Sequence, residues 1–125
     1  MSVDQRTPMI RNLMLPKDTN ALGHIFGGVI LSNIDLAASI HARQVSPKKY
    51  VTKVMREVEF IAPVKVGDVV SYYTSSIKQG NTSVTIGVSV EASRGIGHTE
   101  SIKVTEAEVV MVAVNDDGKP IPINS

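Results

Sequence analysis

The chain has 125 residues, no cysteine and a formal net charge of +1 at pH 7, which predicts a single domain over residues 1–125. A net charge near zero and the absence of runs of lysine or arginine argue against a surface that binds nucleic acid. The lack of cysteine excludes disulfides, thiolate nucleophiles and cysteine metal sites. Because the chain has neither an apolar signal core nor a run of roughly 18 to 20 apolar residues, we expect a cytoplasmic protein that does not enter the membrane.

The first predicted elements are a strand and a long helix. Met9 to Leu15 can form a strand that ends at Pro16, and a polar loop follows it. A helix is predicted from about Gly28 to Gln44, before the break at Ser46-Pro47. Its residues leave almost no polar face, so other elements must surround this helix.

The rest of the chain is predicted to form strands. They are Tyr50 to Ile61, Val69 to Lys78, Thr82 to Ser93 and Ile102 to Asn115, with a hairpin signal at Gln79-Gly80-Asn81. In the first of these strands, strict alternation would place Val54, Val58 and Phe60 on one face.

One apolar helix and about five strands joined mostly by hairpins predict an α+β fold, with an antiparallel sheet curled around the helix. A single sheet of that size cannot cover such a helix on all sides. We therefore expect a second copy of the chain to complete the burial, which gives a homodimer.

The segment from Asn20 to Asp35 is the best candidate for a chemical site. Asp35 lies within the apolar helix, where a carboxylate loses hydration. It could belong to a narrow polar seam and cap a backbone group, or it could face a site at the helix N-terminus. Gly27 and Gly28 have no Cβ, and their N–H groups at the positive end of the helix suit a carbonyl oxygen that gains charge. A glycine pair alone can be a simple turn, but with Asn20 upstream it becomes a candidate acyl-transfer site.

Four segments in order give the chain a family resemblance. They are N-x-x-G-x-x-F-G-G at Asn20 to Gly28, F-x-x-P-V-x-V-G-D at Phe60 to Asp68, G-x-T-S-V at Gly80 to Val84, and V-A-V with D-G-K-P at Val112 to Pro120. Together with Asp35, these segments resemble the hotdog-fold acyl-CoA thioesterases, specifically the YciA-like bacterial group. The resemblance covers nearly the whole chain.

The resemblance implies hydrolysis of acyl-CoA thioesters to free acid and CoA, with no metal or organic cofactor. Asp35 would be the general base that activates water, or the direct nucleophile. Asn20, contributed by the partner subunit, would hold the water or the thioester. The backbone N–H of Gly28, alone or with that of Gly27, would form the oxyanion hole.

The resemblance also suggests residues that bind the substrate. The candidates are His24, Phe26, Ser83, Arg94, Arg56 and Lys119. Arg94 is the preferred phosphate ligand because Gly95 follows it, although surface arginines and lysines are common without such a role. His24 stands where close relatives carry an acidic residue, and a simple loop histidine is its favoured interpretation. His41 and His98 lack ligand spacing, so no metal site is expected.

Relatives in this family form trimers of dimers, so a hexamer is expected. Its additional contacts would use the outer sheet face, predicted to carry Thr85, Val109 and Tyr72 or Tyr73. Two other functions stay open. A hotdog dehydratase or hydratase would use a catalytic histidine such as His24, and a non-catalytic acyl-CoA-binding protein would hold the ligand without turnover.

Overall fold

The structure is a computed structural model that describes residues 6–95, 97 and 100–124. Its elements are β1 (Ile10–Leu13), the short 3-10 helix η1 (Pro16–Asp18), α1 (Gly27–Val45), β2 (Lys49–Phe60), β3 (Val69–Gln79), β4 (Ser83–Arg94) and β5 (Glu100–Val114). The predicted helix and four long strands are confirmed to within a few residues. The first strand is shorter than predicted, because its pairing with β3 ends at Leu13.

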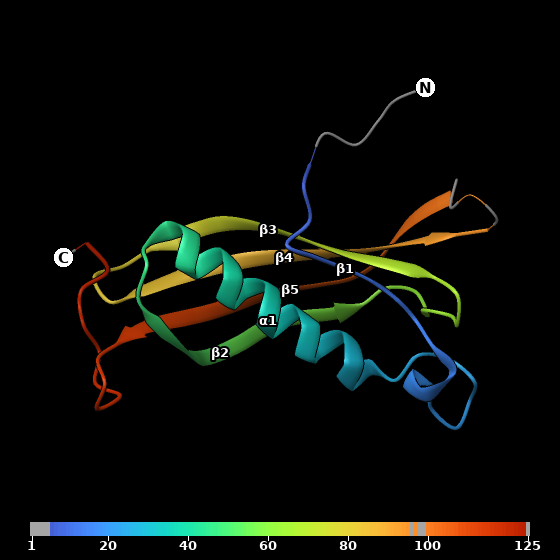
Figure 1. Cartoon of the computed structure of the whole chain (residues 1–125), viewed down its shortest axis with the longest axis horizontal. Helices are drawn as coiled ribbons and strands as arrows, with labels where there is room; N and C mark the ends of the chain where they lie inside the picture. Colours follow the sequence, from blue (N-terminus) through green and yellow to red (C-terminus); the bar gives the residue numbers. More distant parts are fainter. Residues whose placement is uncertain (1–5, 96, 98–99, 125) are drawn as a thin grey trace.

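The five strands form one antiparallel sheet in the order β1-β3-β4-β5-β2. The helix α1 lies along one face of this curled sheet and connects its two edge strands (Figure 1). The predicted α+β architecture is therefore confirmed. Because β2 pairs only with β5, its other edge is open within a single chain.

The core lies between α1 and the sheet. Ile30, Ile34 and three alanines of α1 are buried, and they pack in one cluster with the inward side chains of β4, namely Val84, Ile86, Val88, Val90 and Ala92. The opposite side of the helix is uncovered, since Leu36 is 56% exposed and Ile40 is 39% exposed. This agrees with the expectation that one sheet cannot bury the whole helix. No helix in the described ranges is long and apolar enough to cross a membrane.

Two bulges interrupt β2. Its register against β5 shifts between Thr52 and Val54 and again between Arg56 and Glu59. Each extra residue reverses the alternation of side chains, so the predicted common face of Val54, Val58 and Phe60 is wrong. Val54 pairs with Val110 on the outer face, whereas the ring of Phe60 reaches the helix at Gly27.

The outer sheet face differs in part from the prediction. Tyr73 and Thr85 lie on this face, as expected, in alternation with the inward residues of β3 and β4. Val109 was misassigned, because it is 0% exposed and belongs to the core cluster under the helix. Of the two tyrosines offered as alternatives, Tyr73 is the outward one, and Tyr72 belongs to the same core cluster.

Candidate active site

The N-terminus of α1 lies beneath two aromatic rings. A Cβ on Gly28 would come within 2.4 Å of the Phe26 ring, and one on Gly27 within 3.4 Å of the Phe60 ring. Glycine therefore lets the rings approach the backbone closely. As the first residues of the helix, Gly27 and Gly28 have N–H groups that find no acceptor within it. These donors are available to an oxygen atom placed at the helix end.

Asn20 organises the loop in front of the helix. Its side-chain Oδ1 accepts hydrogen bonds from the N–H groups of Leu22 at 2.9 Å and His24 at 3.2 Å. Its backbone N–H donates to the His24 carbonyl oxygen at 2.7 Å. Because the oxygen is occupied by backbone donors, the amide NH2 is the group that Asn20 can offer to a ligand.

A pocket of about 280 Å³ connects the loop and the helix end. Asn20, His24 and Gly27 line it together with Phe60 and Thr105, and the remaining wall is apolar. The structure thus brings three predicted site residues to one cavity. The sequence did not indicate Phe60 or Thr105 as site residues, because their approach depends on how the end of β2 and the middle of β5 fold over the helix.

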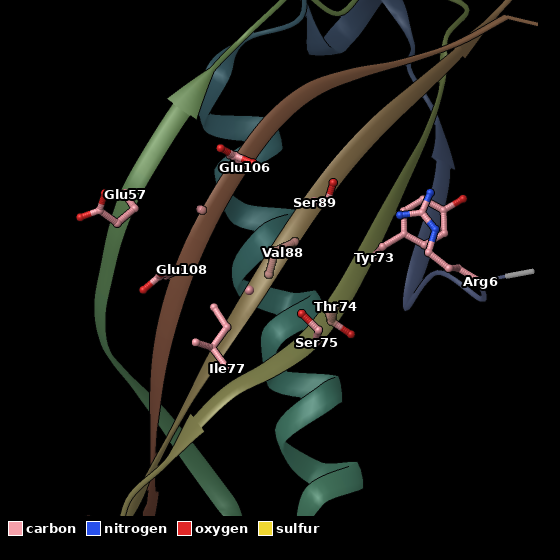
Figure 2. A pocket seen from close by; sticks show the side chains of 12 residues that line it. Arg6, Glu57, Tyr73, Thr74, Ser75, Ile77, Val88, Ser89, Glu106 and Glu108 are labelled. Carbon is pink, nitrogen blue, oxygen red and sulfur yellow. The ribbon is translucent and has the colours of Figure 1, made fainter. Parts of the chain in front are cut away.

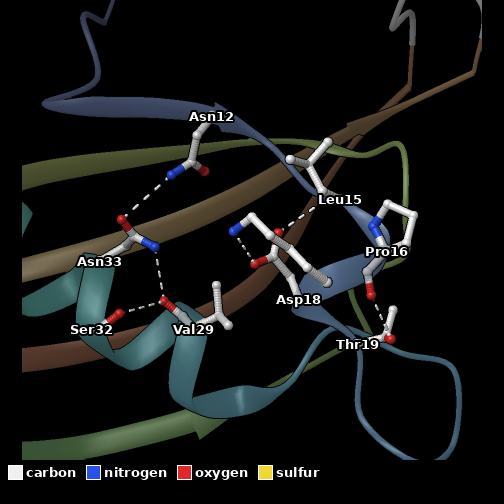
Figure 3. A network of polar contacts seen from close by, with 9 residues as sticks. Asn12, Leu15, Pro16, Asp18, Thr19, Val29, Ser32 and Asn33 are labelled. Carbon is white, nitrogen blue, oxygen red and sulfur yellow. Dashed lines mark hydrogen bonds and ion pairs between the residues drawn. The ribbon is translucent and has the colours of Figure 1, made fainter.

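The region before the pocket is fixed by polar contacts around η1 (Figure 3). The Asp18 carboxylate accepts from the Leu15 N–H at 3.0 Å and from the Lys17 ammonium at 3.2 Å. These two contacts, that of Leu15 first, hold the pKa of Asp18 below its usual value. The Asp18 carbonyl oxygen also accepts from the Phe26 N–H at 2.8 Å, which ties η1 to the start of the helix.

The same view shows a second tie, between β1 and the helix. Asn12 donates to Asn33 at 3.4 Å, and Asn33 donates to the Val29 carbonyl oxygen at 2.9 Å (Figure 3). These contacts hold β1 against the first turns of α1, so both ends of the pocket loop are anchored.

Asp35 lies farther along the helix, beside β2. The Thr52 hydroxyl donates to Asp35 Oδ1 at 2.5 Å, which leaves the second carboxylate oxygen for another partner. Asp35 is half-buried and Thr52 is exposed at the open edge of the sheet. Thr52 was missed by sequence analysis, because a threonine in a strand carries no motif and the bulge that follows it was not foreseen.

Asp35 and the pocket do not meet within one chain. Asp35 is not among the lining residues, and at about 1.5 Å per residue it lies about 12 Å along the helix axis from Gly27. The predicted site is therefore in two parts, a donor-rich pocket at the helix end and a carboxylate with its threonine at the sheet edge.

Arg94 makes structural contacts near the pocket. Its Nε donates to both carboxylate oxygens of Asp68 at 3.0 Å, and its Nη2 donates to the Pro63 carbonyl oxygen at 2.6 Å. Asp68 is nearly fully buried and also accepts from the Lys65 N–H at 2.9 Å. This pair fixes the loop that forms one wall of the pocket, while a role for Arg94 in CoA binding stays a prediction.

The other predicted CoA ligands are spread over the molecule. Ser83 begins β4, at the opposite end of that strand from Arg94. Lys119 follows β5 near the same end as Ser83, because Ser83 pairs with Val112 and Val114 bridges to Pro120. Arg56 pairs with Glu108 at 3.3 Å on β2 and β5. One chain does not gather these residues into a single phosphate site.

A larger hollow of about 390 Å³ lies on the sheet face that points away from the helix (Figure 2). Its lining includes Glu57, Glu106 and Glu108, and Arg6 stacks on the Tyr73 ring at 3.9 Å. None of the predicted catalytic residues lines this hollow. We therefore place the candidate active site at the smaller pocket.

The histidines have different surroundings. The His41 ring bonds the hydroxyls of Thr74 and Ser76, and burial holds the pKa of His41 below its usual value. His98 lies outside the described residues. In the part of the chain that the structure describes, no three metal-ligating side chains are grouped to hold an ion.

The chain is similar in sequence to a known protein family. Residues 22–96 match the family described as the thioesterase superfamily. The acyl-CoA thioester hydrolase YciA of Salmonella typhimurium is 41% identical over 119 residues, which is 92% of this chain and 88% of that protein.

Two solved structures share the fold closely. The hexameric hotdog-fold thioesterase of Campylobacter jejuni has a TM-score of 0.90 and 45% identity, over 97% of this chain and 92% of that one. The hexameric thioesterase of Yersinia pestis has a TM-score of 0.90 and 37% identity, over 99% of this chain and 100% of that one.

Proposed function

This chain belongs to the thioesterase superfamily, and we propose that it hydrolyses acyl-CoA thioesters to a free carboxylic acid and CoA. The observation that carries the proposal is the pairing of two features on one helix. Within the described residues, the N–H groups of Gly27 and Gly28 have no acceptor, and the half-buried Asp35 carboxylate accepts a hydrogen bond through Oδ1 alone. Relatives with about 40% identity over most of their length are acyl-CoA thioester hydrolases.

The proposed reaction begins with a water molecule beside Asp35. Asp35 removes a proton from this water, which attacks the thioester carbonyl carbon. The carbonyl oxygen gains negative charge and accepts hydrogen bonds from the N–H of Gly28, alone or with that of Gly27, at the positive end of the helix. The tetrahedral intermediate then expels the CoA thiolate, which takes the proton back from Asp35.

Direct attack by Asp35 is the second possible course. It would form a mixed anhydride of the acyl group with Asp35 and expel the CoA thiolate. Water would then hydrolyse the anhydride to the free acid and Asp35, and the proton released from this water would go to the thiolate. In both courses the Thr52 hydroxyl orients the carboxylate through Oδ1, and the Asn20 amide donates to the water or the thioester. Neither course requires a metal or an organic cofactor.

The complete site is proposed to form between two chains. Asp35 and Asn20 occupy separate parts of one chain. Leu36, next to Asp35 on the helix, and Val51 and Val54 on the open edge strand β2 are exposed apolar side chains. A two-fold axis at the open edge of β2 would cover this surface and could bring Asp35 of one subunit to Asn20 of the other.

A homohexamer built as a trimer of dimers is proposed for the larger assembly. The solved relatives of Campylobacter jejuni and Yersinia pestis are hexameric, and the outer sheet face offers a surface for contacts between dimers. A cytoplasmic location stays a prediction.

Release of free CoA from a panel of straight-chain acyl-CoAs, followed with a thiol reagent, tests the proposed reaction. We expect thiol release well above the rate without enzyme for at least one chain length. A folded protein that binds acyl-CoA but releases no thiol from any member of the panel would instead support a non-catalytic acyl-CoA-binding protein. Conversion of enoyl-CoA to hydroxyacyl-CoA without thiol release would support the hydratase alternative.

A further inference from the structure

Thr105 is a buried polar residue in the wall of the candidate active-site pocket. It lines the pocket at the helix N-terminus, is 1% exposed, and pairs with Phe60 on β2 and Val90 on β4. Its Oγ1 is buried and has no hydrogen-bond partner among the described residues. Most buried hydroxyls in proteins are paired, so a hydroxyl without a partner in the wall of a pocket points to a ligand or water.

The residues around Thr105 do not require a hydroxyl. Ile25, Ile30 and Val64 form buried parts of the same pocket wall. Valine has the same shape as threonine and would pack there without losing hydrogen bonds to water. The hydroxyl therefore destabilises the empty pocket relative to a methyl group, and a polar ligand atom would compensate for it.

The same pocket includes part of the proposed reaction centre. Asn20 and Gly27 line it together with Thr105, so a thioester held at the helix end would place its acyl group in the cavity that Thr105 borders. The volume of about 280 Å³ lies just below the range of pockets for drug-sized ligands, roughly 300 to 1,000 Å³. Such a cavity suits a short acyl group.

We propose that this pocket is an acyl subsite for short acyl groups that carry a hydroxyl or oxo group, and that Thr105 is the residue that recognises this oxygen. A threonine hydroxyl can donate to an oxo group and accept from a hydroxyl, so one residue serves both. The inference rests on the proposed thioesterase function and adds the class of acyl group to it.

The test compares kcat/KM for butyryl-CoA, 3-hydroxybutyryl-CoA and acetoacetyl-CoA in the unmodified protein and in Thr105→Val. We expect the preference for the two oxygenated thioesters over butyryl-CoA to fall about three- to tenfold, the effect of one neutral hydrogen bond. Thr105→Ser, which keeps the hydroxyl, should retain most of the preference.

Thr85→Val is the matched control, because Thr85 is also a buried strand threonine, 6% exposed, but lies outside the pocket. It should leave the preference unchanged. If Thr105→Val does not fold, Thr105→Ala replaces it, and the same ratio within one variant is compared.

The possible failures are distinct. If the unmodified protein hydrolyses none of the thioesters, the proposed function and this inference are both wrong. If it hydrolyses them and Thr105→Val leaves the ratio unchanged, the inference alone is wrong. An equal loss for all three thioesters would show that the pocket holds the pantetheine arm they share, which also overturns the inference.

Discussion

At the scale of single residues, the contact between Asp35 and Thr52 is the main addition that the structure makes to the predicted site. The carboxylate is half-buried, and one of its oxygens accepts from the Thr52 hydroxyl. A carboxylate held in this way has one oxygen in a fixed position for proton transfer. Oδ1 of Asp35 therefore accepts the hydrogen bond from Thr52, and the other oxygen is the one that would take the proton from water.

Asp35→Asn should remove the base and preserve the shape of the site. The amide oxygen can still accept from Thr52, so we expect normal folding and normal CoA affinity by calorimetry. Turnover should fall about a hundredfold or more, as for the loss of a general base. A folded variant that binds CoA and keeps more than about half of the parent rate would show that Asp35 is not the base.

Thr52→Val should leave Asp35 in place without its donor. We expect kcat to fall about tenfold, because the carboxylate is less well oriented toward water, while KM changes little. Thr52→Ser is the control, since it keeps the hydroxyl and should retain most of the activity. Equal rates for the valine and serine variants would remove Thr52 from the mechanism.

At the scale of elements, two polar contacts fix α1 and the pocket loop to the sheet. The first is the His41 ring between the hydroxyls of Thr74 and Ser76, at 2.9 and 2.7 Å. The second is the ion pair of Arg94 with Asp68, which connects the end of β4 to the loop between β2 and β3. They are tested in different ways. The contact of His41 is tested by a change of pH, because burial lowers the pKa of His41, and the ion pair is tested by replacing Arg94.

Acidification should weaken the contact of His41. Burial lowers the pKa of His41 in the folded state from its ordinary value of 6.5, so the unfolded chain binds the proton more tightly. Its contribution to stability is therefore fully present above about pH 6.5 and is lost as the pH falls through the lower folded-state pKa. The loss should be at most about 1 kcal/mol, because solvent screens the partly exposed ring.

Urea denaturation at pH 7.5 and pH 5.5 measures this effect. His41→Gln should show a smaller difference in unfolding free energy between the two pH values than the unmodified protein. His24→Gln is the control, because His24 is exposed. Identical differences in the His41 variant and the parent would contradict the assignment.

Arg94→Met should leave the buried Asp68 carboxylate without its cation. Asp68 has 3% side-chain exposure, and removal of one partner from a buried pair costs about 3 kcal/mol or more. Urea denaturation should show this loss of unfolding free energy, and Arg43→Met on the exposed end of α1 should show almost none. A loss below about 1 kcal/mol would mean that the pair does not hold the loop.

At the scale of the whole molecule, the single chain has uncovered apolar surface on the helix and sheet edge that carry Asp35 and Thr52. Leu36 on the helix and Val51, Val54 and Val58 on β2 are all more than a third exposed. Side chains of this kind, gathered along an open strand edge, are typical of a surface that another chain covers. Assembly and activity should therefore be linked.

Mixing inactive variants tests the shared site. Asn20→Ala and Asp35→Asn proteins, unfolded and refolded together, should regain part of the activity, because a hybrid dimer carries one intact pair of Asn20 and Asp35. Each variant refolded alone is the control. Hybrids that are demonstrated by mass spectrometry but stay inactive would place both residues of a working site in one chain.

Light scattering coupled to size exclusion at low micromolar concentration tests the hexamer. We expect a mass of six chains of 13.4 kDa. A mass that corresponds to a stable dimer, unchanged when CoA is added, would contradict the trimer of dimers and the use of the outer sheet face for assembly.

The sequence by itself determined the elements of the fold and one part of the site. The spans of α1 and of the long strands follow from hydrophobic periodicity, which is a local property of the chain. The resemblance to thioesterases came from short motifs, and the structure brings Asn20 and Gly27 of the first motif to one pocket. The element spans and the short motifs can be read from the sequence because each depends on residues that are close together in the chain.

The tertiary structure alone decided the contacts that join distant segments. The two bulges of β2, with Glu57 at a φ of 54°, break the alternation on which sequence reasoning relies. The structure alone reveals that Thr52 contacts Asp35, that Thr105 lines the pocket and that Arg94 pairs with Asp68. The physical reason is that strand register and side-chain pairing minimise the free energy of the whole packed sheet, and residues far apart in the chain contribute to it together.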